Sequence, residues 1–370
     1  MELEILNDIT KIGAIKDEWN SLALASTNPS VFSTYEFILT SWQWFDVGNS
    51  QLQVLTMRNE GRLVGLLPLR TRRHRVGAAV ETVVEYAGMT GGDRPYILAR
   101  PQHEGTVWQT ALRALDLMHW DRLSFQNLPE ISPGRLALEH HFRDANRYDV
   151  SCEPSGSAAI LDLDLACKKQ PSPERSECTQ VCGRFFDRFP RAKLTHFDSG
   201  SNIDQAIEKF LSLSTSDKVV APSLFTESRQ HIEFFQALMR RLVGNGWTEI
   251  HTLEQDGEIL AAGLTHTFEK NATFHETIWS SEHQAAQPGA YLTVQVLERL
   301  RSQSTKRLES VVTHSHHMWP WARGQVSTVN LGVGNRTWKS ALRRSPLASI
   351  TPTGRRVHSS GEKAKTPTSS

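Results

Sequence analysis

Three residues in one short stretch could carry out acid–base chemistry. His275 and Glu276 are neighbours in an apolar segment that reads as a strand, and Glu282 lies in the turn that follows. A histidine or carboxylate can act as a general base by taking a proton from an attacking amine or hydroxyl. Neighbours on a strand point to opposite sides, so we expect only one of His275 and Glu276 to face a cleft. The alternative for each carboxylate is a solvated side chain.

A histidine cluster lies further along the chain, in the string His314-x-His316-His317. On a strand, His314 and His316 would share one face, and this spacing could hold zinc or copper. No cysteine or carboxylate lies at ligand spacing beside the cluster, so we expect no metal. His314 and His316 could instead line a substrate groove with Trp319, and loop or packing roles are the alternative.

The four cysteines favour no structural metal site. They all lie within residues 152–182, and only Cys178 and Cys182 are close in sequence. A structural zinc site needs two close pairs of ligands. We therefore expect reduced, unpaired thiols.

Residues 249–317 contain the elements that would position these side chains. Asp256-Gly257 between two apolar runs indicates a hairpin, followed by a strand over 273–280. Gln287-Pro288-Gly289-Ala290 then begins a helix, and a last strand covers 308–313. The first N–H groups of a helix lack internal partners and face the positive end of its dipole, so this helix start is a plausible anion site.

The same order of features occurs earlier in the chain, which indicates a tandem duplication. The matched pairs are 3–6 with 194–197, 29–32 with 222–225, 54–67 with 250–263, 103–118 with 289–301, and 122–125 with 307–311. Each half therefore reads as strand, helix, helix, a meander of strands, helix and strand. This pattern predicts a mixed α/β (α+β) sheet with helices on both faces.

Length and composition describe an ordinary globular protein of two domains. The chain has 370 residues, 39% hydrophobic and 22% charged, with a net charge of +1 that does not favour a nucleic-acid partner. The N-terminus lacks the features of a signal peptide, and no apolar run approaches about 20 residues, so we expect a cytoplasmic protein. We expect an N-terminal domain over 1–167, a linker over 168–184, a C-terminal domain over 185–344 and a disordered tail over 345–370.

Several short strings resemble the CelD-like (cellulose biosynthesis) branch of the GNAT acyltransferase superfamily, a relative of the Fem-type aminoacyltransferases. They are Val31-Phe32-Ser33-Thr34-Tyr35-Glu36-Phe37, Gly61-Arg62-Leu63-Val64-Gly65-Leu66-Leu67-Pro68-Leu69, Leu128-Pro129-Glu130, Asp256-Gly257-Glu258-Ile259-Leu260-Ala261-Ala262 and Gln287-Pro288-Gly289. The resemblance implies two GNAT-like (acyl-CoA N-acyltransferase) folds in tandem. It also implies acyl-CoA as co-substrate, acetyl-CoA or longer.

In that superfamily the donor lies beside a parted pair of strands, with its pyrophosphate on the turn before the central helix. By position, the resemblance implies Gln284, Gln287, Gly289 and Ala290 as the donor-binding residues. Gln287 stands where the usual pattern has glycine, and Pro288 lacks an N–H donor. Tyr291 could stabilise a leaving thiolate, with packing as the alternative. The first half carries Glu104 at this place, which would repel phosphate, so we expect it to be non-binding and to wall the acceptor groove.

A second departure concerns the segment after the strand at 308–313. The branch usually carries an Asp-rich turn and Tyr-Lys there, whereas this chain has Thr313-His314-Ser315-His316-His317-Met318-Trp319. The leading hypothesis is transfer of an acyl group to an amine or hydroxyl of a small-molecule, saccharide or lipid-linked acceptor, in exopolysaccharide or cell-envelope biosynthesis. The alternatives are a catalytically inactive scaffold of polysaccharide synthesis and Fem-like use of aminoacyl-tRNA, which the neutral charge disfavours. The sequence does not indicate the oligomeric state.

Overall fold

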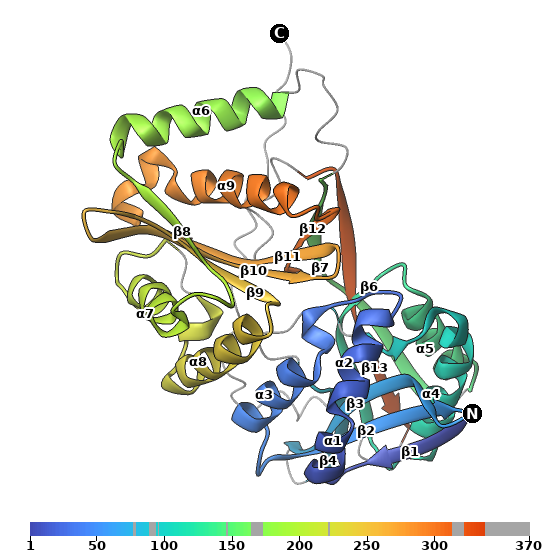
Figure 1. Ribbon diagram of the computed structural model, residues 1–370. Coiled ribbons are helices and arrows are strands. Elements are labelled where there is room, and N and C mark those ends of the chain that lie inside the picture. Colours follow the sequence, from blue (N-terminus) through green and yellow to red (C-terminus); the bar gives the residue numbers. More distant parts are fainter. Residues whose placement is uncertain are drawn as a thin grey trace.

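A computed structural model describes residues 1–76, 79–88, 94, 96–145, 147–163, 173–220, 223–312 and 322–336. Figure 1 shows two layered halves joined by long strands. The first half comprises β1 (Glu2–Leu6), α1 (Ile9–Ala14), α2 (Lys16–Ala25), η1 (Val31–Ser33), α3 (Tyr35–Phe45), β2 (Ser50–Asn59), β3 (Arg62–Val76), β4 (Ala79–Tyr86), β5 (Leu98–Ala99), η2 (Pro101–His103), α4 (Glu104–Leu117), β6 (Arg122–Pro129), α5 (Pro133–Asp144) and β7 (Tyr148–Asp162).

From β8 onward the second half repeats most of this order; α6 precedes its first strand, and no helix within the described residues matches α5. It comprises α6 (Pro173–Arg188), β8 (Lys193–Phe197), α7 (Ile203–Ser214), η4 (Leu224–Thr226), α8 (Arg229–Gly244), β9 (Thr248–Gln255), β10 (Glu258–Phe268), β11 (Asn271–Trp279), η5 (Ser281–Ala286), α9 (Pro288–Ser302), β12 (Arg307–Ser310) and β13 (Gly324–Asn335). The predicted mixed α/β sheet and the duplication are confirmed.

Some matched residues have the same structural role in both halves. Ser30 and Ser223 each cap a short 3-10 helix by accepting a hydrogen bond from the amide two residues on. Gly65 in β3 lies against Val107 of α4, where an added Cβ would come within 2.5 Å of a valine methyl group. At the matching position Gly263 of β10, an added Cβ would lie 3.4 Å from Leu292 of α9, which is an ordinary contact. Only at Gly65 does the absent side chain let the central helix, α4, pack directly on its sheet.

The hairpins form where the sequence predicts them. Asp256 and Gly257 have φ values of +53° and +85°, and Glu60 and Gly61 have φ values of +51° and +75°. Two consecutive positive φ angles twist the turn in the sense that matches the flanking strands. This places β2 against β3 and β9 against β10, both antiparallel.

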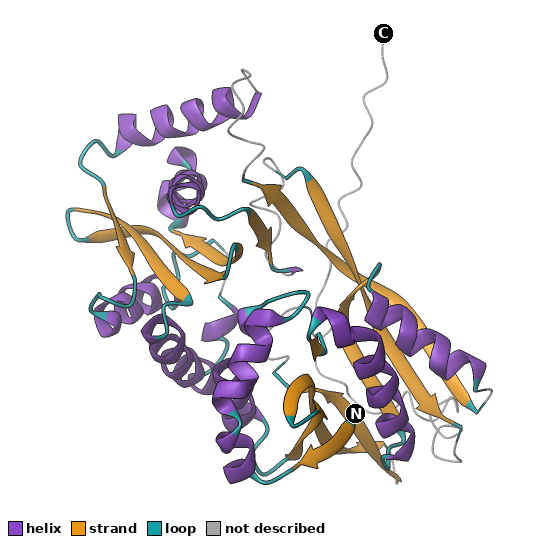
Figure 2. Cartoon of the chain, turned by 45° about the vertical axis from the view of Figure 1, so that its right-hand side comes forward, coloured by secondary structure: helices purple, strands orange, loops and turns teal. Residues whose placement is uncertain are grey.

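All strands on the main path belong to one continuous sheet, in which the last strands of the two halves are exchanged. The order is β1-β2-β3-β4-β6-β13-β7-β12-β11-β10-β9-β8, and β5 pairs with β3. Strand β13, from the end of the chain, pairs with β6 of the first half, and β7 of the first half pairs with β12 of the second. Strands β7 and β13 also pair with each other from Tyr148 to Ile160. Figure 2 shows these two long strands running between the halves.

Helices cover both faces of the second-half sheet. In Figure 1, α6 and α9 lie on one face of β8–β11, and α7 and α8 lie on the other. The main buried core runs through both halves, from Phe37 of α3 to Phe234 of α8 and Val329 of β13. Helices α3 and α8 meet at this junction, where the rings of Phe45 and Phe234 are 5.0 Å apart. The halves therefore share one interior as well as one sheet.

Several elements differ from the expectations above. Helix α6 occupies Pro173–Arg188, most of the span expected to be a linker, because Val181, Phe185 and Phe189 are buried against α9 and its surroundings. Helix α5 and strands β7 and β13 were not predicted. The expected tail lies outside the described residues. In the described part of the chain, no helix combines the length and apolarity needed to span a membrane.

The exchanged strands predict that both halves unfold together. Leu331 of β13 is 1% exposed and belongs to the shared core. Leu331→Ala should lower the free energy of unfolding by about 2–5 kcal/mol and leave a single transition. Chemical denaturation followed by near-UV and far-UV circular dichroism measures both quantities.

The matched control is Gln325→Ala, on the exposed part of the same strand, which should change stability by at most about 0.5 kcal/mol. Two separate transitions in Leu331→Ala would contradict the shared core.

Candidate functional site

Strands β11 and β12 part in the middle of the second half. They pair in parallel only from Asn271 and Arg307 to Phe274 and Ser310. Beyond Phe274, β11 continues to Trp279 along β10. Val220 donates a backbone hydrogen bond to the Trp279 carbonyl, which closes the far end of the open edge. Within the described residues, no strand pairs with this edge of β11 over 275–278.

The first two residues past the parting are His275 and Glu276, and both point to the same side. The register between β10 and β11 shifts so that Leu264 pairs with Glu276 and Thr265 with Phe274, leaving His275 as an extra residue. Such a bulge interrupts the alternation of side chains. His275 contacts the ring of Phe225, and Glu276 accepts a hydrogen bond from Ser223 in the same segment. The expectation that these neighbours face opposite sides was therefore wrong.

Both side chains are buried, each 2% exposed. His275 Nδ1 lies 2.7 Å from His266 Nε2, and His266 Nδ1 lies 2.7 Å from the Thr248 hydroxyl. Burial lowers the pKa of His266 to about 3, because its charged form would lose hydration. His266 is therefore neutral at pH 7. The ring of Phe32, from the first half, packs edge-on against both His266 and His275.

The start of α9 has a left-handed residue at its cap. Gln287 has a φ of +53°, and its side-chain oxygen is buried without a hydrogen-bond partner. Gln284 is exposed and Ala290 is half-buried. Gly289 is buried, and an added Cβ there would lie 2.6 Å from the indole of Trp279. The packing of Trp279 thus accounts for this glycine without a ligand.

Tyr291 packs under α6. Its ring stacks on Phe185 with a centroid distance of 4.2 Å and an angle of 9°. Burial is the main cause that raises the pKa of Tyr291, so its hydroxyl stays protonated at neutral pH. The structure thus gives Tyr291 the packing role that was its alternative, and the hydroxyl remains a hydrogen-bond donor.

Two adjoining cavities lie where the halves meet. We call the first the inner cavity: about 200 Å³, lined by Thr27, Asn28, Pro29, Ser30, Phe32, Arg94, Tyr96, Asn271, Ala272, Thr273, Arg307, Glu309 and Val326. The outer cavity, about 510 Å³, is lined by Thr27, Asn28, Tyr96, Pro129, Glu130, Ile131, Ser132, Pro133, Gln325, Val326 and Ser327. They share Thr27, Asn28, Tyr96 and Val326. Phe32 lines the inner cavity and also contacts His275.

An arginine from the first half reaches across to the end of β12. Arg94 is 6% exposed and has a φ of +46°. Its guanidinium forms an ion pair with Glu309 and donates to the Ser310 carbonyl over 3.2 Å. The Ser310 hydroxyl accepts from the Ala159 amide of β7. The last residue of β12 is therefore held by partners other than β11, at the point where the two strands part.

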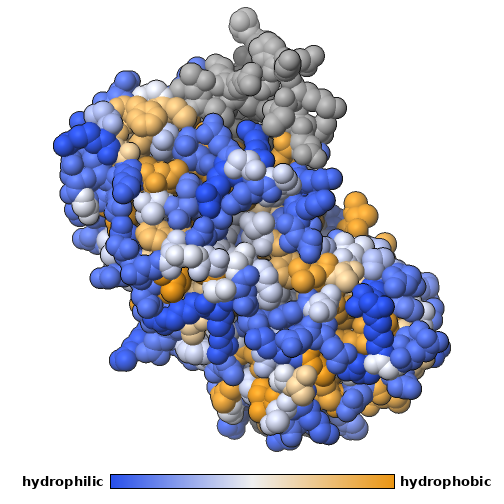
Figure 3. Space-filling model, in the orientation of Figure 1, coloured by the Kyte–Doolittle hydropathy of each residue, from blue (hydrophilic) through white to orange (hydrophobic). Residues whose placement is uncertain are grey.

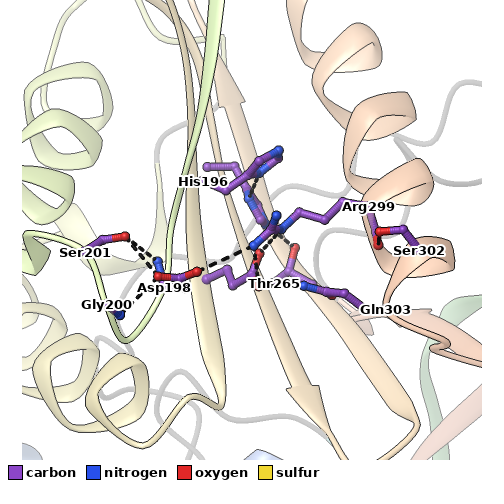
Figure 4. A network of polar contacts seen from close by, with 10 residues as sticks. His196, Asp198, Gly200, Ser201, Thr265, Arg299, Ser302 and Gln303 are labelled. Atoms are coloured by element: carbon purple, nitrogen blue, oxygen red, sulfur yellow. Dashed lines mark hydrogen bonds and ion pairs between the residues drawn. The ribbon is translucent and has the colours of Figure 1, made fainter.

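Among the described residues, two groups have ligand atoms close enough together to hold a metal ion. The first group belongs to the polar network shown in Figure 4. Nδ1 of His196 lies 2.8 Å from Nδ1 of His251, and Glu249 is close to both. However, Arg299 donates to both oxygens of Glu249. Its positive charge would repel a cation. Burial is the main cause that lowers the pKa of both histidines, and the charge of Arg299 adds to this effect. We interpret this network as a structural ion pair.

Glu258, Glu282 and His283 form the other such group, near the start of α9. His283 Nε2 lies 2.7 Å from Glu258, and Lys218 pairs with Glu282. Glu282, a candidate base, is exposed and already forms an ion pair with Lys218. Its alternative, a solvated side chain, is what the structure shows.

The structure brings together only part of the predicted site. His275 and Glu276 share one buried position, whereas Gln284, Gln287, Gly289 and Ala290 lie at the helix start. His314, His316 and Trp319 lie outside the described residues. The sequence did not predict a role for Arg94 or Arg307, although the composition of Gly92-Asp93-Arg94-Pro95 indicated a loop.

Comparisons with known proteins agree with this geometry. Residues 184–340 match the family model described as an acetyltransferase (GNAT) domain. The chain is similar in structure to FemX, with 9% identity, a TM-score of 0.60, and coverage of 90% of this chain and 97% of FemX. A conserved protein of unknown function from Bacteroides thetaiotaomicron VPI-5482 has 8% identity, a TM-score of 0.56, and coverage of 90% and 100%. L-PGS from Bacillus licheniformis has 13% identity, a TM-score of 0.50, and coverage of 91% and 94%.

No curated protein matches the chain significantly in sequence. At these identities the structural likenesses show the fold alone. The fold is GNAT-like, as the resemblance implied, and the matched family supports acyl transfer by the domain over 184–340. The CelD-like branch stays a prediction.

The buried histidines predict a loss of stability in acid. His266 has a folded pKa of about 3, below the roughly 6.5 of an exposed histidine. The contribution of neutral His266 to the free energy of unfolding is complete above pH 6.5. It is lost as the pH falls towards 3, because in this range only the unfolded chain takes up the proton. Denaturant titrations at pH 7 and pH 5 measure this loss.

His266→Gln should reduce the difference in unfolding free energy between pH 7 and pH 5 by about 2 kcal/mol. The control is His140→Gln, whose side chain is 80% exposed. Equal pH dependence in the two variants would show that burial does not keep His266 neutral.

Proposed function

We propose that this protein is an acyltransferase, with the donor bound in the second half and the acceptor held between the halves. The observation that carries the proposal is the parting of β11 and β12, which places His275 and Glu276 at the opening. The matched family supports the reaction class. The acceptor would be an amine or hydroxyl compound, in exopolysaccharide or cell-envelope biosynthesis.

The residues at the start of α9 fit an acyl-CoA donor in part. The amides of Gly289 and Ala290 belong to the first turn, where no intrahelical acceptor exists. The orphaned oxygen of Gln287 marks an unsatisfied polar position in the same turn. Ala290 is the more open of the two amide positions, because Trp279 lies against Gly289. Acyl-CoA would supply the acyl group as a thioester, with its phosphates favoured by the helix dipole.

Glu276 and His275 are the groups that could accept a proton. The Ser223 hydroxyl donates to Glu276 over 2.7 Å, which orients the carboxyl group. His275 belongs to a chain of hydrogen bonds through His266 to Thr248, which fixes the orientation of its ring. Both side chains are shielded from water, and in such surroundings electrostatic interactions are stronger. Their role would be to take the proton of the acceptor nucleophile.

The inner cavity is the position that we propose for the acceptor. It extends from Thr273, two residues before His275, to Arg94 and Tyr96 of the first half. The ring of Phe32 lines the cavity and also contacts His275, so we expect this ring to move for proton transfer. The first half would then serve as a wall of the acceptor site, as the sequence predicted.

A catalytically inactive scaffold is the second candidate. One observation favours it: Trp279 covers Gly289, and α6 packs on Tyr291, so part of the predicted donor turn is covered by the protein. In that case the chain would bind no donor.

Substitution of Ala290 tests the donor site without disturbing Gly289. A carboxylate in the first turn of a helix is favourable for folding but repels phosphate. Ala290→Glu should therefore keep the melting temperature and weaken binding of acetyl-CoA and longer acyl-CoAs by about tenfold. Isothermal titration calorimetry measures the affinity.

The matched neutral variant is Ala290→Gln, which has the same size and should bind nearly as the unmodified chain. If the unmodified protein bound no acyl-CoA at millimolar concentration, the scaffold would become the better account.

A further inference from the structure

The two cavities between the halves differ in chemistry. The charged side chains of the inner cavity are Arg94, Arg307 and Glu309. Both guanidinium groups pair with the one carboxylate, Arg307 over 2.5 Å. The cluster therefore carries one unit of excess positive charge. Most of the remaining lining is hydroxyl or amide, from Thr27, Asn28, Ser30, Asn271 and Thr273.

The outer cavity has a larger apolar share. Pro129, Ile131, Pro133 and Val326 contribute to its wall. Ile131 is 90% exposed, so its side chain presents apolar surface to the cavity mouth with little cover from the protein. On the face shown in Figure 3, hydrophilic residues predominate and apolar residues are scattered. The apolar residues of the outer cavity thus lie beside the polar, positively charged inner cavity.

The two cavities adjoin, because Thr27, Asn28, Tyr96 and Val326 line both. Volumes of about 200 and 510 Å³ lie within the range of small-molecule sites when combined.

We propose that the two cavities bind one molecule of an anionic amphiphile, with its anionic head group in the inner cavity and its aliphatic chain along the outer cavity. Arg307 is the principal anion contact, because it is 46% exposed, whereas Arg94 is 6% exposed and bound to the Ser310 carbonyl. The apolar chain lies over Ile131 and Val326. The identification of this molecule as the acyl acceptor rests on the proposed function; its binding does not.

Calorimetric titration with four probes, each below its critical micelle concentration, tests the proposal. Dodecyl phosphate has both the anion and the chain, octyl phosphate has a shorter chain, glycerol phosphate lacks the chain, and dodecyl maltoside lacks the charge. Each buried methylene should raise affinity by about fourfold. Dodecyl phosphate should therefore bind at least about tenfold more tightly than octyl phosphate, and more tightly than the other two.

Variants with matched controls assign the two ends. Arg307→Gln should weaken dodecyl phosphate by about tenfold and leave dodecyl maltoside unchanged. Its control is Arg240→Gln, on a similarly exposed arginine that pairs with Asp204. Ile131→Asp should abolish the difference between dodecyl and octyl phosphate, whereas Leu117→Asp, at another highly exposed aliphatic residue, should retain it.

The proposal is overturned if glycerol phosphate binds as tightly as dodecyl phosphate, if binding occurs only above the micelle concentration, or if Arg307→Gln behaves like Arg240→Gln. These titrations contain no acyl-CoA. Their outcome is therefore independent of the Ala290 experiment, and each proposal can fail while the other stands.

Discussion

The functional geometry depends on which neighbours hold β12. This short strand pairs with β11 along one edge and with β7 along the other. Its last residue, Ser310, accepts a hydrogen bond from Arg94 on its carbonyl and one from the Ala159 amide on its hydroxyl. Beyond it, the Val311 amide still donates to the Phe274 carbonyl, and the pairing of β11 with β12 goes no further. The end of β12, at the opening beside His275 and Glu276, is thus held by the first half.

The first half therefore contributes to the second-half site at three places. Strand β7 holds β12, Arg94 binds the end of β12, and Phe32 packs on His275. This arrangement explains why a duplicated chain could keep both copies when only one contains the parted strands with His275 and Glu276. The first half supplies a wall of the site and holds the end of β12, whereas the second half supplies the reactive groups. The two halves therefore differ in which residues the site requires.

Local signals predicted the elements with strong turn or cap chemistry. Asp256-Gly257 and Glu60-Gly61 marked both hairpins, and Pro288-Gly289 marked the start of α9 to within one residue. Strands β7 and β13 were missed because Pro154, Gly156 and three glycines in β13 read as loop. Their mutual pairing over long distances in the chain overrides that local preference.

The site was less predictable than the fold, for two physical reasons. A bulge depends on the register of the neighbouring strand, so no local pattern at His275 and Glu276 announced that both would face one side. Charge clusters between halves depend on how the halves meet: Arg94 and Glu309 are 215 residues apart in sequence. Gly289 was interpreted as a donor-binding residue, whereas in the structure it lies against Trp279.

The exchange of closing strands has a consequence for biosynthesis. Ribosomes deliver a chain from its N-terminus, at about 5–20 residues per second. Strand β6 is complete at Pro129, but its partner β13 ends only at Asn335. Until then the nascent first half carries an exposed strand edge, which is a template for unwanted pairing with other chains. The need for chaperones during translation should accordingly decrease only late, when the final strand emerges.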